Sequence, residues 1–385
     1  MHIKELNAKI IVDSRNEKTI SVSVRSEHGI FTASSPSGKS IGKHEKPSYR
    51  NNIENDIQEI KNLKIDFLID NFSDLEKVEK LVKGRIGANS IFALESAILK
   101  AIAFEKGKEI WQVINEKAKK MPFPLGNCVE GGSHSHSKLK PDFQEFLVIP
   151  KAEKFIDNVF LMKQMHKNIG EALKAKNFTD ENAWQTEKSN EEVLEIFDKL
   201  RKEMEIESDK KIEIGIDVAS SSFYSNLYEY KNPEKHLDSK EQLEYISELI
   251  KKYNLFYVED AFDEEYFSDF KKLREKTSDC LIVSDDLTTS NLQRFVLALR
   301  SKAIDAIILK PNQIGSLIEI SKIVKLAKKL NIKIIFSHRS GETNESIISD
   351  LAFGFQADFV KFGIVGKERE VKLKRLIEIE RQISL

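Results

Sequence analysis

The chain has 385 residues, more than one average domain, which leaves room for one large barrel and a smaller unit. Its 61 Lys and Arg residues balance 62 Asp and Glu residues, which argues against nucleic acid or an anionic membrane as the main partner, because both select basic proteins. No apolar run approaches the length of a membrane span, so we expect no membrane partner. The two cysteines, Cys128 and Cys280, lack metal-binding spacing and predict reduced thiols in a cytoplasmic protein.

Strands followed by helices are predicted in the first third of the chain. The three predicted strands, where apolar residues cluster or alternate, span residues 3–12, 19–25 and 30–33. A loop of small and polar residues follows at 34–46, and the clearest helical pattern spans 90–106. This order predicts a small α+β capping domain over residues 1–120.

From residue 211 onward, a short apolar run, a polar turn and an amphipathic helix repeat along the chain. Each of six apolar runs ends on a charged residue or a histidine, and these end residues are Asp217, Glu259, Asp285, Lys310, His338 and Lys361. Successive end residues are 42, 26, 25, 28 and 23 positions apart. After the first step, this spacing is the length of one strand-and-helix unit, and it predicts consecutive parallel strands.

Two further strands are predicted ahead of this repeat. They lie near residues 123–129 and 143–149 and precede a helix pair at 152–176 and 190–206. The eight strands together predict an α/β fold, a β/α barrel over residues 121–385 whose first connections are irregular. The carboxyl ends of the strands of such a barrel converge on the active site, so the six polar end residues are candidate functional groups.

Three of the strand ends are carboxylates, Asp217, Glu259 and Asp285. Carboxylates that converge on one point repel each other unless a cation neutralises them, and all-oxygen ligation favours a hard divalent ion such as Mg²⁺. The alternative is that each carboxylate pairs with a neighbouring Lys or Arg. Lys310, at the next strand end, is expected beside that cation, which would depress its pKa and suit it to act as a base. The alternative for Lys310 is a structural ion pair.

An anion site is predicted after the next strand. Residues 337–343 contain an arginine, hydroxyl groups and backbone N–H groups at a strand-to-helix turn, a combination that binds phosphate well. The loop near residue 132 carries His134 and His136 two positions apart. No third soft ligand stands nearby, so this spacing favours a mobile loop with one substrate-contacting histidine over a metal pair.

Several motifs in this sequence resemble the enolase family, and the resemblance runs over nearly the whole chain. The most specific matches are Lys310-Pro-Asn-Gln-Ile-Gly-Ser316 and Ser337-His-Arg-Ser-Gly-Glu-Thr343. Shorter matches are Val12-Asp-Ser-Arg15, Pro36-Ser-Gly-Lys-Ser-Ile-Gly42, Gly87-Ala-Asn-Ser90, Gly131-Gly-Ser-His134, Asp142-Phe-Gln-Glu-Phe146 and Ser284-Asp-Asp-Leu287. The resemblance implies the reversible dehydration of 2-phosphoglycerate to phosphoenolpyruvate in glycolysis and gluconeogenesis, with two Mg²⁺ ions per active site.

The resemblance also implies roles for individual residues. The metal ligands would be Asp217, Glu259 and Asp285 for the first ion, with Ser40 helping to bind the second. Lys310 would remove the C2 proton, and Glu181 would act as the acid at C3, with its pKa raised by burial beside other carboxylates. Glu145 would assist at the departing hydroxyl group and His134 would close over the substrate. The remaining substrate contacts would be Arg339 and Ser340 at the phosphate, and His338 and Lys361 at the carboxylate and hydroxyl side.

Two segments differ from the family pattern. The glycines that normally surround the acid glutamate are replaced in Thr179-Asp-Glu-Asn-Ala183, so an enolase-like binding protein with weak or no turnover is the alternative function. In relatives, the arginine matching Arg15 bonds a glutamate of the C-terminal helix across a dimer interface. The aligned position here is Arg381, and we therefore expect a homodimer with an altered interface.

Overall fold

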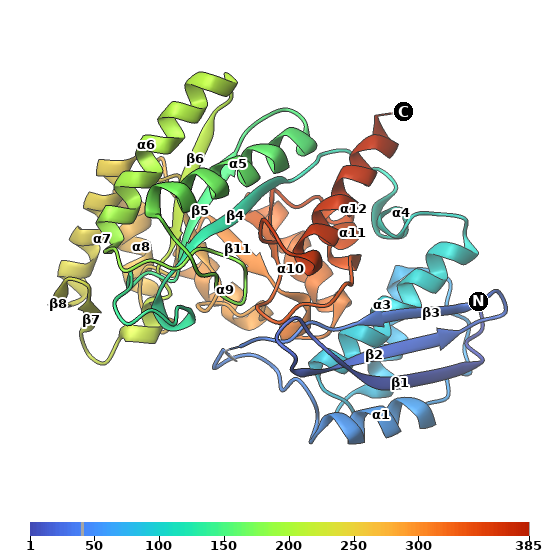
Figure 1. Ribbon diagram of the computed structural model, residues 1–385. Helices are drawn as coiled ribbons and strands as arrows, with labels where there is room; N and C mark the ends of the chain where they lie inside the picture. Colours follow the sequence, from blue (N-terminus) through green and yellow to red (C-terminus); the bar gives the residue numbers. More distant parts are fainter. Residues whose placement is uncertain (40–41, 385) are drawn as a thin grey trace.

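The computed structural model describes residues 1–39 and 42–384, and it begins with a three-stranded antiparallel sheet (Figure 1). The strands are β1 (Glu5–Val12), β2 (Lys18–Arg25) and β3 (Ile30–Ser34), in that spatial order. Ile20, Val22 and Val24 are fully buried, so the alternation in β2 marks the face that packs on the helices, as predicted.

Helices cover this sheet and join it to the rest of the protein. They are α1 (Ile53–Asn62), η1 (Phe72–Asp74), α2 (Leu75–Val82), α3 (Ala88–Glu105) and α4 (Ile110–Asn115). Helix α3 is buried on nearly all sides because it contacts β2 and β3 on one side and η4 (Pro311–Gln313) on the other. The Asn312 side-chain amide donates a hydrogen bond of 3.0 Å to Oδ1 of Asn89, which links η4 to α3. The boundary at residue 120 stays a prediction.

Eight strands form a closed barrel, which confirms the predicted fold class. The strands are β4 (Phe123–Glu130), β5 (Glu145–Pro150), β6 (Ile212–Asp217), β9 (Tyr257–Glu259), β10 (Leu281–Ser284), β11 (Ala306–Leu309), β12 (Lys333–Ser337) and β13 (Phe359–Lys361). Strand β5 runs antiparallel to both of its neighbours, whereas the other pairs are parallel.

The reversed direction of β5 decides which of its ends meets the active site. Glu145, the first residue of β5, pairs in register with Glu130 at the end of β4 and with Asp217 at the end of β6. All three carboxylates therefore lie at the same mouth of the barrel. Inside the barrel, below this mouth, apolar side chains such as Leu147, Tyr257 and Ile308 fill the space, so the polar chemistry is confined to one end.

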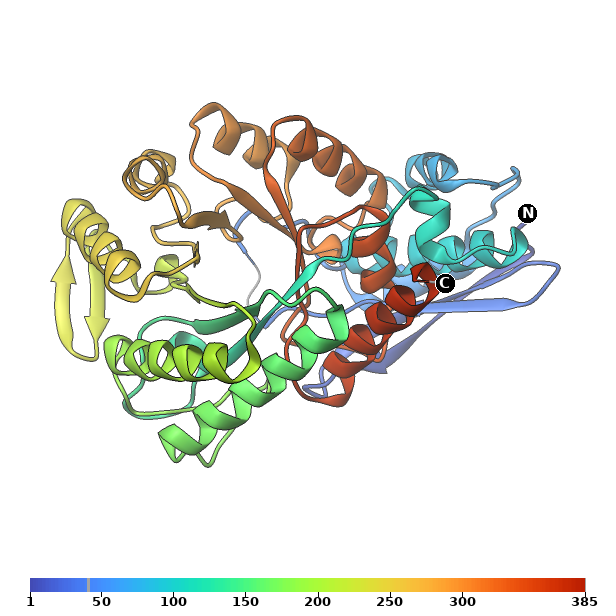
Figure 2. The same cartoon turned by 90° about the horizontal axis from the view of Figure 1, so that it is seen from above.

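Helices surround the barrel, and a hairpin extends from it. The helical elements are η2 (Gly132–His134), α5 (Phe155–Leu173), α6 (Asn190–Ser208), η3 (Ser220–Phe223), α7 (Ser239–Tyr253), α8 (Phe267–Lys276), α9 (Leu292–Arg300), α10 (Leu317–Lys329), α11 (Ile347–Gly354) and α12 (Lys367–Ile383). The hairpin of β7 (Tyr228–Lys231) and β8 (Glu234–Leu237) lies at the end of the molecule remote from the N-terminal sheet (Figures 1 and 2). The hairpin lies between β6 and β9 and accounts for the separation of 42 positions between Asp217 and Glu259. No helix within residues 1–39 and 42–384 has the length and apolar character needed to cross a membrane.

Candidate active site

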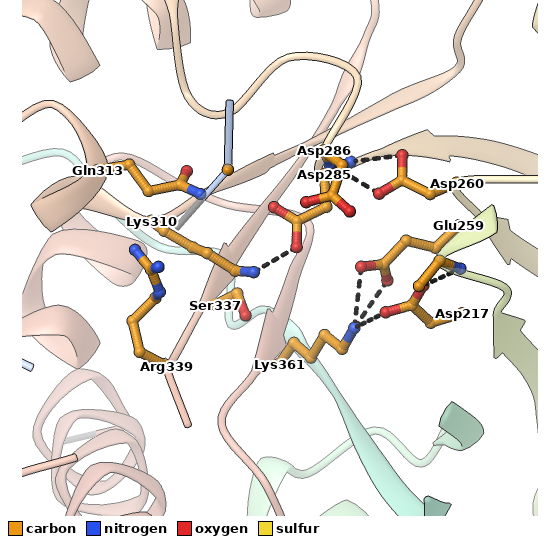
Figure 3. A network of polar contacts seen from close by, with 12 residues as sticks. Asp217, Glu259, Asp260, Asp285, Asp286, Lys310, Gln313, Ser337, Arg339 and Lys361 are labelled. Atoms are coloured by element: carbon orange, nitrogen blue, oxygen red, sulfur yellow. Dashed lines mark hydrogen bonds and ion pairs between the residues drawn. The ribbon is translucent and has the colours of Figure 1, made fainter. Parts of the chain in front are cut away.

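The six polar strand ends converge at the mouth of the barrel, as predicted. Figure 3 shows Asp217, Glu259, Asp285, Lys310 and Lys361. Most of them line a pocket with about 600 Å³ of space, part of it open to solvent. Its walls include Asp217, Asp285, Lys310, His338 and Lys361, whereas Glu259 lies behind them with no exposed surface. The pocket is almost entirely polar, and it receives its charged groups from strand ends that are far apart in the sequence.

Lys361 lies among the carboxylates of three neighbouring strands. Its Nζ is 2.8 Å and 3.0 Å from the two oxygens of Glu259, 3.3 Å from Asp217 Oδ2 and 2.8 Å from Glu145 Oε2. Burial would lower the pKa of Lys361, but these carboxylates more than offset that effect and hold its pKa well above the ordinary value. Lys361 is therefore a fixed positive charge at the mouth.

Lys310 forms an ion pair with Asp285 at the next two strand ends. Burial would lower the pKa of Lys310, but the Asp285 carboxylate more than offsets it, and the pKa is raised above the ordinary value. The expectation that Lys310 has a depressed pKa is therefore wrong for this arrangement, because it assumed a neighbouring cation. The same pairing shows that the predicted alternative, carboxylates paired with lysines, describes part of the site.

The two lysines do not pair with every carboxylate oxygen at the mouth, and the remaining oxygens are suitable ligands for a divalent cation. Asp217, Glu259 and Asp260 each present an oxygen within 4.8 Å of the others, and Asp260, Asp285 and Asp286 form a second such group. Buried Asp285 Oδ1 has no hydrogen-bond partner. Burial raises the pKa of Asp217 to about 6 and that of Glu259 to about 8, in spite of Lys361. Carboxylate oxygens with unneutralised charge are ligands that Mg²⁺ prefers.

The position of Asp260 was not predicted, although it follows Glu259 directly. Its φ of +43° places it in the left-handed region, and its carboxylate accepts hydrogen bonds from the N–H groups of Asp285 (3.2 Å) and Asp286 (2.7 Å). Asp260 therefore orients the turn that carries Asp285. It also stands between the two acidic groups, so the predicted triad of Asp217, Glu259 and Asp285 is joined by a fourth carboxylate.

Glu181, the predicted acid, lies beside His338 in the wall of the pocket. The His338 Nε2 atom lies 3.1 Å from Glu181 Oε2, and both side chains are buried. Burial would raise the pKa of Glu181, but the interactions with His338 and Arg369 more than offset it, and the pKa lies well below the ordinary value, although burial also lowers the pKa of His338. The predicted rise in the pKa of Glu181 is therefore wrong here. Glu145 behaves in the opposite way, because burial raises its pKa to about 8.

The loop that carries Glu181 keeps a tight turn without the family's glycines. Asn182 adopts a left-handed φ of +61°, which asparagine tolerates, whereas Ala183 is not among the residues with positive φ. Asn182 O lies 2.9 Å from His166 Nε2, and the indole N–H of Trp184 donates to His166 O at 2.8 Å. The loop is thereby fastened to helix α5.

Gly170 in α5 allows the close packing of Trp184 against this helix, since a Cβ atom there would overlap the indole ring of Trp184. We expect Gly170→Ala to lower the free energy of unfolding by about 1–3 kcal/mol through overpacking, and to reduce turnover by shifting the Glu181 loop. Urea denaturation and a turnover assay would measure both effects. In an exposed helix interior the same change is stabilising by about 0.5–1 kcal/mol, and a gain of that size would contradict the packing described here.

The predicted anion site lines the same pocket as Glu181. Arg339 forms two contacts of 3.1 Å with the carboxylate of Glu45, a residue of the 34–46 loop that was not predicted. Ser340 Oγ accepts a 2.7 Å bond from the N–H of Lys39. The predicted ligand Ser40 lies outside the described residues. Arg369 of α12 donates to the carbonyl groups of Arg339 and Ser340, which fixes this turn.

Among the described residues, His134 lines the pocket and His136 does not, and the contact of His134 with substrate stays a prediction. The Nδ1 atom of His134 lies 2.9 Å from Oε1 of Glu130, the fully buried last residue of β4. Glu130, Glu45 and Arg369 were all missed from the sequence. Glu130 carried a usable signal, because it ends a strand as the six predicted residues do. Glu45 and Arg369 lie in a loop and in a helix, where no such pattern marks them.

Comparison with known proteins adds an independent line of evidence. The chain matches the model of the enolase N-terminal domain over residues 3–114 and that of the enolase C-terminal TIM barrel domain over residues 118–385. It is 33% identical over 399 residues to the enolase of Picrophilus torridus, with 99% of each chain covered. It is 34% identical over 405 residues to the enolase of Methanosphaera stadtmanae, covering 99% of this chain and 97% of that one. The chain therefore belongs to the enolase family and is a lyase of the phosphopyruvate hydratase class.

Proposed function

We propose that this enzyme catalyses the Mg²⁺-dependent, reversible dehydration of 2-phosphoglycerate to phosphoenolpyruvate, with Lys310 as the base. The observation that carries the proposal is the convergence of Lys310, the acidic strand ends and Arg339 on one polar pocket. Family membership supports a small-molecule substrate and a divalent metal. Asp217, Glu259 and Asp285, with Asp260 between them, are the proposed ligands of the first ion, and a second ion would use Ser40.

The base side has to remove a very weakly acidic proton. A divalent cation held by Asp217, Glu259 and Asp285 would supply positive charge that stabilises the second negative charge on the substrate carboxylate as the C2 proton leaves. Lys310 takes that proton as a neutral amine. This requires that the Asp285 carboxylate interact with another positive group, so that it no longer raises the pKa of Lys310. The proposed role of Asp285 as a metal ligand meets this requirement. Lys361, held as an ammonium by Glu259 and Glu145, stabilises the same carboxylate.

The acid side has to protonate the departing C3 hydroxyl group. We assign this proton to Glu181, with Glu145 beside the hydroxyl group. Glu181 is ionised in the arrangement described, since His338 and Arg369 hold its pKa low, so it must gain its proton when substrate enters. At the phosphate end, Arg339 and Ser340 bind the substrate once Glu45 releases the guanidinium.

The alternative function, substrate binding with little or no turnover, is favoured by one observation, the lowered pKa of Glu181. A direct assay separates the two functions. We expect purified protein mixed with 2-phosphoglycerate and Mg²⁺ to form phosphoenolpyruvate, detected by its ultraviolet absorbance. Calorimetric binding of 2-phosphoglycerate without product would favour the alternative, and the absence of both binding and product would reject the proposal.

A homodimer with altered contacts stays a prediction. Arg15, which pairs across the interface in relatives, here lies 3.4 Å from the carbonyl oxygen of Gly38 and 3.5 Å from Ser37 Oγ in its own chain. Arg381 of α12 is exposed. Two arginines repel each other, so the proposed dimer is held by other contacts.

A further inference from the structure

One buried carboxylate at the barrel mouth has no role in the proposed mechanism. Glu130 ends strand β4, has no exposed surface and pairs in register with Glu145 on β5. It does not line the pocket, whereas His134, four residues later, does. Glu130 therefore stands behind His134 as seen from the substrate.

We propose that Glu130 is a positioning residue of the reaction, which holds His134 through Nδ1 so that Nε2–H faces the pocket and donates to the C3 hydroxyl group. This inference rests on the proposed function. The contact that carries it is the 2.9 Å separation of Glu130 Oε1 and His134 Nδ1. A carboxylate on one ring nitrogen fixes the tautomer and leaves the other nitrogen for the substrate.

The charges around His134 favour its imidazolium form. Glu130 faces it from β4, Glu181 from the 177–185 loop and Glu145 from β5, and Glu130 and Glu181 each place an oxygen within 4.8 Å of its ring nitrogen and of each other. Burial would lower the pKa of His134, but the Glu130 bond and these carboxylates more than offset it, and the pKa is raised. Arg369, the positive group on this side, and His338, whose pKa is lowered by burial, face Glu181.

Within residues 1–39 and 42–384, no Lys or Arg forms an ion pair with Glu130. The ion pair that it forms within the described part of the chain is with His134. Burial raises the pKa of Glu130 and the His134 bond opposes that rise, so an ionised Glu130 and a protonated His134 stabilise each other. An imidazolium at Nε2 donates a charge-assisted hydrogen bond, which stabilises negative charge on the C3 oxygen as its bond to carbon lengthens.

The first measurement uses the wild-type enzyme and needs no disruptive variant. NMR titration of ¹³C-histidine-labelled protein, with the His134 signal assigned from His134→Gln, is expected to give a His134 pKa above the ordinary histidine value. A value below it would overturn the inference. Glu130→Gln keeps an oxygen acceptor and removes the charge, so the His134 pKa should fall in that variant. Glu234→Gln is the matched control, because Glu234 faces exposed His236 on the remote hairpin.

Kinetics give the second measurement. We expect Glu130→Gln to lower kcat about 10-fold to 100-fold with little change in KM, and to move the basic limb of the kcat profile to lower pH. In a His134→Gln background the same change should have no further effect, because Glu130 acts through His134. A full additional loss there, or wild-type kcat in the single variant, would overturn the inference and leave the proposed function intact. Wild-type protein that forms no phosphoenolpyruvate would instead reject the proposed function, and the NMR result would stand apart from it.

Discussion

Lys310→Met is expected to lower kcat for dehydration of 2-phosphoglycerate about 10³-fold to 10⁴-fold, the upper range for loss of a general base. Methionine keeps much of the side-chain volume but removes the amine that takes the C2 proton. Since Lys310 pairs with Asp285 near the proposed metal ligands, KM and metal affinity have to be measured alongside kcat. A steady-state assay at saturating Mg²⁺ separates these effects.

Isotope exchange tells the base from the acid. In ²H₂O, wild-type enzyme should exchange the C2 proton of 2-phosphoglycerate with solvent, and Lys310→Met should not. Glu181→Gln should form little phosphoenolpyruvate but keep the exchange, because the C2 proton is removed before the C3–O bond breaks. Lys235→Met is a matched control, since Lys235 lies on the remote hairpin, where it contacts the ring of Tyr245 of α7. Persistent exchange in Lys310→Met would move the base to another residue.

Removal of divalent metal is expected to abolish turnover and to lower stability. Mg²⁺ at 100 times its Kd should raise the free energy of unfolding by about 2.7 kcal/mol, provided that it binds the folded state alone. Thermal unfolding with chelator and after readdition of Mg²⁺ measures this effect. Glu259→Gln should lose most of it, whereas Glu275→Gln, on the exposed face of α8, should keep it.

The stabilisation by Mg²⁺ should grow as pH rises from about 6 to about 8. Burial raises the pKa of Asp217 to about 6 and of Glu259 to about 8, so the metal-free folded state holds protons that the unfolded chain has already released. Through these two groups the metal-free protein therefore loses stability as pH rises, and a cation that replaces the protons restores it. A shift in melting temperature that is independent of pH would contradict this ligand assignment.

The sequence predicted the positions of the residues proposed for proton abstraction and metal binding better than the surroundings of the proposed acid Glu181. Asp217, Asp285, Lys310 and Lys361 each end a short apolar run, and parallel strands bring their carboxyl ends together by geometry alone. The direction of β5 was not predictable in this way, because an apolar run has no polarity of its own. Glu145 reaches the mouth from the start of its strand.

The charge state of Glu181 shows a second limit of sequence reasoning. Burial beside carboxylates predicted a raised pKa, and the burial is correct. The direction of the pKa shift of Glu181 depends on His338 and Arg369, which lie more than 150 residues away in the chain and contact Glu181 only in the folded barrel. A pKa is a property of neighbours in space, and the same motif in another fold would titrate differently.

The reversal of β5 also means that the two parts of the site are carried by different kinds of structure. Because β5 leaves the mouth instead of reaching it, the chain returns there twice in this quarter of the barrel, in the segment with His134 and in the segment with Glu181. Of the groups proposed for metal binding and proton abstraction, Asp217 and Glu259 end hydrogen-bonded strands, and Asp285 and Lys310 directly follow theirs, whereas His134 and Glu181 lie in the segments between strands. Loops accept replacement more readily than a closed sheet does. Substitutions such as those at Asn182 and Ala183 can therefore alter the loss of the C3 hydroxyl group without changing the groups proposed to remove the C2 proton.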